Sequence, residues 1–339
     1  MLHIIFFALL ASTFLLGMTW MRIGLFNLSG NRMENWLQKF TNSPFMGMLA
    51  GIGMTAILQS SSAVTVIAVG LVSARILTFP QTIGIILGTN IGTTITLEFF
   101  TFDLTKMVIP FIIIGIGLQF FKNIKFKSLS LIFLGIGIIF ASMNGFELLA
   151  KSIEDVPLIQ KLIHLMKDNI VISFITGTFL TALIQSSTVM TGIAMSFLNS
   201  GTFSLDTGIA IMIGANIGTC ATALLASIGA GNEARLTAYA HIWLNLIGAI
   251  IFLPLISILG HASSIISDQP PTQLAHASVI YNAAVSLLFL PFAQMFGQYI
   301  IKLLMVNKIG ISLGKWRLQN LFQVESPLLA TFYRHLPLF

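Results

Sequence analysis

The chain has 339 residues, of which 56% are hydrophobic and only 8% are charged, with a formal net charge of +6. A soluble domain carries roughly 25% charged residues, so this composition excludes an ordinary soluble protein. The basic residues gather in connecting segments, which is typical of a membrane protein and not of a nucleic-acid binder. One cysteine, Cys220, excludes an internal disulfide and a thiolate metal cluster. We therefore predict an all-α polytopic membrane protein in the lipid bilayer, with no nucleic-acid partner.

Long apolar stretches occur along most of the chain. About 20 apolar residues cross the hydrocarbon core of a bilayer, where only helices or closed barrels are stable. These stretches are too long and continuous for the alternating strands of an outer-membrane barrel. In chain order, we expect spanning helices near residues 4–21, 80–100, 106–121, 129–146, 206–228, 237–260 and 273–301.

The sequence contains an internal duplication. Residues 51–62 correspond to 177–188, and residues 88–94 correspond to 214–220, both at an offset of 126 residues without a gap. The identities fall on polar and small residues, whereas chance similarity between membrane helices would fall on Leu, Ile and Val. Repeats with helices interrupted near the middle of the membrane are typical of secondary transporters.

Lys and Arg favour the cytoplasmic side of a membrane protein. One arrangement makes every strongly basic loop cytoplasmic: residues 45–73 and 171–198 are re-entrant helical hairpins, each entering and leaving on one side. The N-terminus is then outside and the C-terminus cytoplasmic. Three crossings separate the hairpins, so the two structural repeats are inverted. The basic residues behind this prediction are Arg22, Arg32, Lys39, Arg75, Lys122, Lys125, Lys127, Arg235, Lys302, Lys308, Lys315, Arg317 and Arg334.

This topology divides the chain into five parts. Residues 1–40 form a first transmembrane helix and a cytoplasmic loop, and 41–146 form the first repeat. Residues 147–169 are a surface linker, expected as a mixed-charge helix outside the membrane. Residues 170–304 form the second repeat, and 305–339 a cytoplasmic tail. Each repeat combines a re-entrant hairpin with interrupted transmembrane helices, in a multi-pass protein of the cell membrane.

A Gln-Ser-Ser sequence lies at the centre of each expected hairpin. Ser and Thr favour helix N-caps, and a helix that begins there directs free N–H groups and a partial positive charge toward an anion. The alternative is that these small residues only allow close helix packing, but their duplication at a fixed spacing from a second polar block disfavours it. We predict a phosphate site formed by Gln59, Ser60, Ser61, Ser62, Gln185, Ser186, Ser187 and Thr188.

The second polar block, residues 88–94 and 214–220, supplies neutral oxygens from Asn and Thr. Sodium prefers such oxygen ligands, and we expect the glycines to allow an unwound stretch whose carbonyls face inward, as in other transporters. The alternative is close helix packing, because Gly88 and Gly92, like Gly214 and Gly218, form a small-xxx-small pattern.

Two further asparagines lie in the last two predicted spans. Asn245 and Asn282 each precede a proline by nine residues, and an asparagine in hydrocarbon needs a polar partner. His241 shares a helix face with Asn245, although a buried histidine is more often a hydrogen-bonded structural group than a ligand. The predicted sodium ligands are Thr89, Asn90, Thr93, Asn216, Thr219, Asn245 and Asn282.

Over residues 40–305 these motifs resemble the type II sodium-dependent phosphate cotransporters. The resemblance rests on the paired Gln-Ser-Ser blocks, the Gly-x-Asn-Ile-Gly-Thr blocks and the His-x-x-x-Asn helix. Many eukaryotic relatives have Asp where this chain has Ile242, which puts in doubt any ion site that depends on that carboxylate. The resemblance implies a dual-hairpin site with Gln59, Ser60, Ser61, Gln185, Ser186 and Ser187 near phosphate and sodium.

The function expected from these observations is sodium-coupled symport of inorganic phosphate by alternating access. A doubly charged phosphate is costly to bury alone, and the predicted intramembrane site contains no Lys or Arg. The neutralising charge should therefore arrive with the substrate, and two sodium ions per divalent phosphate would make an electroneutral cycle. Sodium is a co-substrate, and no cofactor is expected.

Several alternatives remain open. A sodium- or proton-coupled carrier of another oxyanion, such as sulfate or a phosphonate, fits the hairpins almost as well. A phosphate sensor or scaffold without transport, and a passive channel, are further readings, and a homodimer is also left open. An enzyme is disfavoured, because the six histidines form no His-Glu-x-x-His motif and no serine lies in Gly-x-Ser-x-Gly.

Overall fold

The computed structural model describes residues 2–29, 43–153 and 156–306, and within these ranges the elements are helices, with no strand. The expected tail beyond residue 306, Arg32 and Lys39 lie outside the described residues. The elements in chain order are α1 (Leu2–Ser29), α3 (Pro44–Leu58), α4 (Ser61–Ser73), α5 (Phe79–Phe100), η1 (Thr105–Met107), α6 (Val108–Gln119), α7 (Ile124–Ile153), α8 (Pro157–Asp168), α9 (Ile170–Ile184), α10 (Ser187–Asn199), α11 (Leu205–Ala226), α12 (Asn232–Phe252), η2 (Leu253–Leu255), α13 (Ile256–Ile266), α14 (Pro270–Phe289), η3 (Leu290–Phe292) and α15 (Ala293–Val306).

Six helical stretches among the described residues are long and apolar enough to cross a membrane. They contain α1, α5, α7, α11, α12 with α13, and α14 with α15. A seventh span is added if α8 and α9, which meet at a bend of 117°, count as one. Helices α3 and α4 are shorter apolar helices, as is Thr105–Gln119, where a span was expected near residues 106–121. The prediction of a polytopic helical membrane protein is confirmed.

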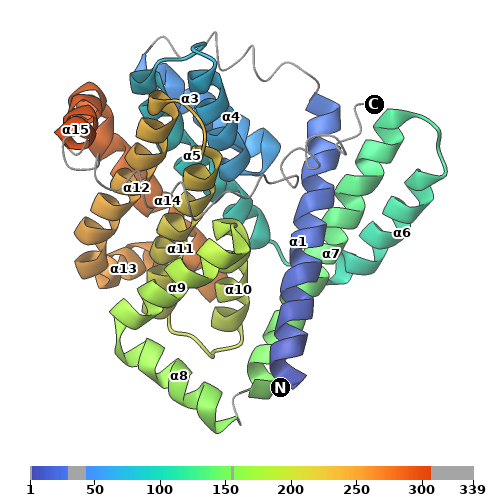
Figure 1. The fold of residues 1–339 in the computed structure, drawn as a ribbon. Coiled ribbons are helices and arrows are strands. Elements are labelled where there is room, and N and C mark those ends of the chain that lie inside the picture. Colours follow the sequence, from blue (N-terminus) through green and yellow to red (C-terminus); the bar gives the residue numbers. More distant parts are fainter. Residues whose placement is uncertain (1, 30–42, 154–155, 307–339) are drawn as a thin grey trace, which may run out of the picture. The chain divides into compact units, whose positions relative to one another are not determined.

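Some boundaries differ from those expected. Helix α1 continues to Ser29 instead of ending near residue 21, because the apolar pattern resumes after Arg22. Helix α7 continues to Ile153, so the first part of the expected surface linker belongs to this long helix, and a separate amphipathic helix, α8, follows it. Figure 1 shows α1 running alongside α7.

The two predicted repeats have the same internal packing. Helix α3 packs on α5 in the first repeat, and α9 packs on α11 in the second. The contacts correspond residue by residue at the sequence offset of 126. A Cβ added at Gly88 would collide with the carbonyl oxygen of Met48, and a Cβ added at Gly214 would collide with that of Phe174.

This packing corrects one expectation. Helices α5 and α11 run without a break through residues 88–94 and 214–220, so no unwound stretch is present there. The glycines allow close helix approach, which was the alternative interpretation of the small-xxx-small pattern. The side chains of the block, and not its main-chain carbonyls, are therefore available for ligand chemistry.

The half-helices that follow the two Gln-Ser-Ser sequences pack across the repeats. Helix α4 contacts α11 and α12 as well as its own α5, and α10 contacts α5 and α14 as well as its own α11. Helix α10 also lies against α7 and α1, where Phe14, Phe100, Phe140 and Ile193 belong to one buried cluster. This apolar cluster fixes α10 relative to the long helices.

Candidate functional site

The first Gln-Ser-Ser sequence forms a sharp break between two helices. Helix α3 ends at Leu58, and Gln59 adopts a left-handed conformation with φ 52°. Ser60 is the N-cap of α4, and its Oγ accepts a hydrogen bond from the main-chain N of Ala63 at 3.2 Å. The predicted helix break is confirmed at this position, which we call the first tip (residues 59–62).

The second Gln-Ser-Ser sequence repeats this geometry. Helix α9 ends at Ile184, and Gln185 is left-handed with φ 58°. Ser186 is the N-cap of α10, and its Oγ accepts from the main-chain N of Val189 at 3.4 Å. Left-handed conformations are uncommon for residues other than glycine, so their recurrence at the two glutamines marks a matched pair of sites. We call residues 185–188 the second tip.

Both tips have the chemistry of an anion site. The first N–H groups of a helix have no partner within that helix, and the helix start carries a partial positive charge. The hydroxyls of Ser61 and Ser187 lie in the first turns of α4 and α10, beyond the capping serines. Each tip therefore offers N–H and O–H donors to an oxyanion, as expected from the sequence.

The surroundings of the two glutamines differ. Arg22 Nε donates to the Gln59 carbonyl oxygen at 2.8 Å, and Thr96 Oγ1 donates to Gln59 Oε1 at 2.6 Å. Gln185 is exposed, and its side chain has no hydrogen bond among the described residues. The counterpart of Thr96 at the 126-residue offset is Thr222, whose buried Oγ1 has no partner in the described part of the chain.

Arg22 corrects the charge argument made from the sequence. It was assigned to a loop after the first helix, and the site was expected to contain no Lys or Arg. The longer α1 instead carries Arg22 to the first tip. A fixed positive charge therefore lies beside the predicted phosphate ligands, and sodium is not the only cation near an anion bound there.

The predicted sodium ligands form two asparagine pairs. Asn90 Nδ2 of α5 donates to Asn245 Oδ1 of α12 at 2.9 Å, and Asn216 Nδ2 of α11 donates to Asn282 Oδ1 of α14 at 3.0 Å. Within each pair, the amide of Asn245 or Asn282 also donates to the main-chain carbonyl four residues earlier. The two C-terminal asparagines thus complete the polar centres, each paired with one copy of the repeated block.

Each pair leaves one amide oxygen available. Asn90 Oδ1 and Asn216 Oδ1 accept no hydrogen bond among the described residues. Thr93 and Thr219 lie three residues later on the same helix faces, and their hydroxyls donate to the carbonyl one turn back. Amide and hydroxyl oxygens of this kind suit a hard cation such as sodium.

Thr89 fits this arrangement less well than the other predicted sodium ligands. It is fully buried, its hydroxyl donates to the Ile86 carbonyl, and its counterpart in the second repeat is Ala215. No hydrogen bond joins Thr89 to the Asn90–Asn245 pair in the described structure.

Sequence reasoning missed several neighbours of these residues. Cys220 Sγ accepts from Asn245 Nδ2 at 3.3 Å, and Thr96 holds Gln59. The recurrence of Thr96 at Thr222, at the same offset of 126 residues, was a usable signal. His241 is buried and contributes its main-chain carbonyl to Asn245, while its Nδ1 has no partner among the described residues.

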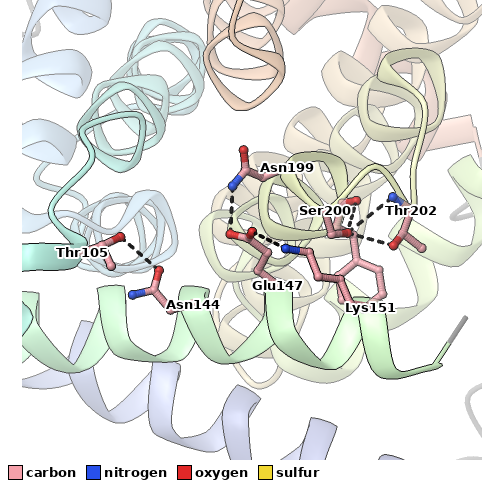
Figure 2. Close-up of polar contacts among 8 residues, drawn as sticks. Thr105, Asn144, Glu147, Lys151, Asn199, Ser200 and Thr202 are labelled. Atoms are coloured by element: carbon pink, nitrogen blue, oxygen red, sulfur yellow. Dashed lines mark hydrogen bonds and ion pairs between the residues drawn. The ribbon is translucent and has the colours of Figure 1, made fainter.

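A cavity of ≈ 400 Å³ lies apart from both tips. It is lined by Phe100 at the end of α5 and residues 101–103 and 105 after it, by the second half of α7, the C-terminal end of α10 and the start of α14. None of the predicted ligands lines it. Figure 2 shows its polar contacts: Glu147 receives hydrogen bonds from Asn199 at 2.8 Å and Lys151 at 3.1 Å, and Thr105 contacts Asn144. Hydrogen bonds from Thr105 lower the pKa of Asp103 at the cavity edge.

An ionisable pair links the repeats near the same end of α5. Glu98 Oε1 of α5 lies 2.8 Å from His276 Nδ1 of α14, and both side chains are partly exposed. Ionisable residues in membrane helices are costly, and they usually mark functional positions.

Comparison with known proteins places this arrangement in a family. The Na+/Pi-cotransporter family matches the chain twice, over residues 13–148 and 145–267, which agrees with the internal duplication. The protein YqeW of Bacillus subtilis (strain 168) is 39% identical over 298 residues, which are 87% of this chain and 96% of YqeW. No solved structure matches.

Two named groups of transport proteins are more distant. YjbB of Escherichia coli (strain K12), whose name assigns it provisionally to inorganic phosphate export, is 25% identical over 82% of this chain. This match spans only 51% of YjbB. The human sodium-dependent phosphate transport protein 2B is 43% identical over 76 residues, 21% of this chain and 11% of its own length. With the family matching both halves of the duplicated region, the chain belongs to the Na+/Pi-cotransporter family.

Proposed function

We propose that this chain is a secondary active transporter that carries inorganic phosphate together with sodium across the cell membrane by alternating access. The main observation that supports this proposal is the matched pair of tips. Each begins a helix with a capping serine and free N–H groups, and each half-helix packs on helices of the other repeat. Two similar helix starts that attract anions, on either side of a repeat interface, suit a carrier that presents one substrate alternately to two sides.

Sodium is the proposed co-substrate, because the two asparagine pairs supply neutral oxygens within the same helices that contact the tips. A tenfold sodium gradient contributes about 1.4 kcal/mol per ion, so two ions support roughly hundredfold accumulation of phosphate. The same site could serve import or export, because the gradients of the ion and of phosphate set the direction of transport. YjbB is named for the export of inorganic phosphate, and the human protein 2B for sodium-dependent phosphate transport.

The proposal includes a topology. The C-terminus lies in the cytoplasm and the N-terminus outside, and the two tips enter the membrane from opposite sides as re-entrant hairpins. This follows the distribution of Lys and Arg. Labelling of single cysteines introduced at the two ends of α4 and α10 from each side of the membrane tests the topology directly.

The decisive experiment is uptake of radiolabelled phosphate into proteoliposomes under an inward sodium gradient, compared with an equal choline gradient. We expect concentrative uptake with sodium only. Uptake that ignores sodium would contradict the coupling. If unlabelled sulfate or a phosphonate reduced the uptake of labelled phosphate more strongly than unlabelled phosphate does, the carrier would be assigned to that other oxyanion. Flux that never exceeds equilibrium would identify a channel, and binding without flux a sensor.

A second candidate, proton coupling, is favoured by the Glu98–His276 pair. The pair holds one carboxylate between α5 and α14, the helices that carry Asn90 and Asn282. Under this candidate, Glu98→Gln abolishes any acceleration of uptake by an inward proton gradient and leaves its dependence on sodium intact. Parallel measurements with a proton gradient, a sodium gradient and both, in wild type and Glu98→Gln, separate the two cations.

A further inference from the structure

The Arg22 guanidinium is an unusual group in this position. It lies on α1, within a stretch apolar enough to span a membrane, seven residues before the helix ends at Ser29. An arginine inside a membrane helix is costly, and such residues usually mark a functional site. Arg22 is partly buried, and its Nε donates to the Gln59 carbonyl at 2.8 Å.

No acidic side chain within the described residues neutralises Arg22. Among the described residues the ion pairs are Lys151–Glu147 and His276–Glu98, and neither involves Arg22. Guanidinium has five N–H donors, and one hydrogen bond from Arg22 is made within the described structure. The remaining donors and the positive charge are therefore available to a ligand.

The group next to Arg22 attracts the same kind of ligand. Gln59 is followed at once by Ser60, the N-cap of α4, and by Ser61 and Ser62, which are only partly buried. The start of α4 carries free N–H groups and a partial positive charge. The guanidinium and the start of α4 lie together at the first tip, and both repel cations. The first tip therefore suits an anion.

The second tip lacks this charge. Leu148 stands 126 residues after Arg22, and no Lys or Arg hydrogen-bonds to Gln185 in the described structure. The duplication therefore supplies two similar helix starts, and the arginine distinguishes one from the other.

We propose that Arg22 is a phosphate-binding residue that supplies the fixed positive charge of the first tip. The inference rests on the proposed function, because it names a ligand for the anion of that site. The planar guanidinium matches two oxygens of a phosphate, whereas a lysine at the same position would act only as a point charge. Substrate binding is then asymmetric, with the first tip contributing most of the affinity for the dianion.

A competing role for Arg22 is structural. Basic side chains often hydrogen-bond the last carbonyls of a helix, and Arg22 could act only by holding Gln59 at the end of α3. Thr96 separates the two roles, because it also holds Gln59 but carries no charge. Thr96→Val loosens the same glutamine without removing the cation.

The test is equilibrium binding of radiolabelled inorganic phosphate to purified wild type, Arg22→Gln, Arg22→Lys and Thr96→Val. Thermal unfolding of each variant checks that it is folded. We expect Kd to rise roughly tenfold or more in Arg22→Gln, in line with the loss of a hydrogen bond to a charged group. Arg22→Lys should recover part of this loss, and Thr96→Val should change Kd by less than about threefold.

Several results would overturn the proposal. One is a Kd for phosphate that is unchanged in Arg22→Gln. Another is a Kd that rises equally in Arg22→Gln and Thr96→Val. The third is a wild type that binds no phosphate. Phosphate uptake measured with the same preparations keeps the two proposals apart. If wild type binds phosphate and Arg22→Gln does not, but sodium drives no uptake, the transport proposal fails while the role of Arg22 stands.

Discussion

At the first tip, the Gln59 carbonyl and side chain accept hydrogen bonds from Arg22 and Thr96, whereas at the second tip the Gln185 side chain is exposed. The serines and threonine after Gln185 are buried, while those after Gln59 are only partly buried. The backbone is nonetheless the same, with left-handed glutamines and capping serines at both tips. Local sequence therefore sets the shape of each tip, and distant helices set how firmly its glutamine is held.

This difference matters for the proposed mechanism of alternating access. Repeats that exchange environments are a usual basis of such transport, and in this structure the two tips have different environments. Variants made in matched pairs, one at each tip, can show whether the asymmetry affects substrate binding, ion binding or only stability.

The largest effect is expected from Ser61→Ala and Ser187→Ala. Each removes a hydroxyl that can donate to phosphate without removing the capping serine. A hydrogen bond to a charged group contributes about 1.5–3 kcal/mol, so sodium-driven uptake at low phosphate should fall roughly tenfold to hundredfold in each variant.

Ser12→Ala is the matched control for these serines, because Ser12 is exposed on α1 and bonds only to its own helix. Normal uptake in both tip variants would show that the tips are not the substrate site. A loss at one tip alone would mean that the asymmetry extends to binding itself.

A smaller effect is expected from Asn90→Ala and Asn216→Ala, which remove the two available amide oxygens. The sodium concentration for half-maximal uptake should rise about tenfold, the equivalent of about 1.4 kcal/mol. The KM for phosphate at saturating sodium should change little. The measurement is uptake as a function of sodium at fixed ionic strength.

Asn144→Ala is the control for the asparagine variants, since Asn144 lies in the separate cavity and bonds to Thr105. If either asparagine variant kept the wild-type sodium dependence while remaining folded, that pair would not be a sodium site. A change in only one of them would assign different ions to the two repeats.

The smallest effect is expected from Thr96→Val compared with Thr222→Val. Thr96→Val leaves Gln59 Oε1 without its donor and should lower the free energy of unfolding by about 1 kcal/mol. Thr222→Val removes a buried hydroxyl that has no partner, so it should leave stability unchanged or slightly raised. Thermal unfolding in detergent measures both, and equal shifts would contradict the asymmetry between the two tips.

The sequence by itself determined the class of protein, the duplication and the helix breaks. The low share of charged residues and the long apolar stretches exclude an ordinary soluble protein. Ser60 and Ser186 each cap the start of a new helix through a local hydrogen bond. These features depend on residues close together in the chain. They could therefore be predicted without knowledge of the packing.

Only the tertiary structure decided which partners meet. The pairing of Asn90 with Asn245 and of Asn216 with Asn282 joins residues 155 and 66 positions apart. The unbroken course of α5 and α11 depends on neighbouring helices whose carbonyls fill the space beside the glycines. The position of Arg22 at the first tip depends on where α1 packs, and no local pattern specifies that. Long-range contacts are set by the fit of whole helix faces, and a periodic apolar pattern does not distinguish one such fit from another.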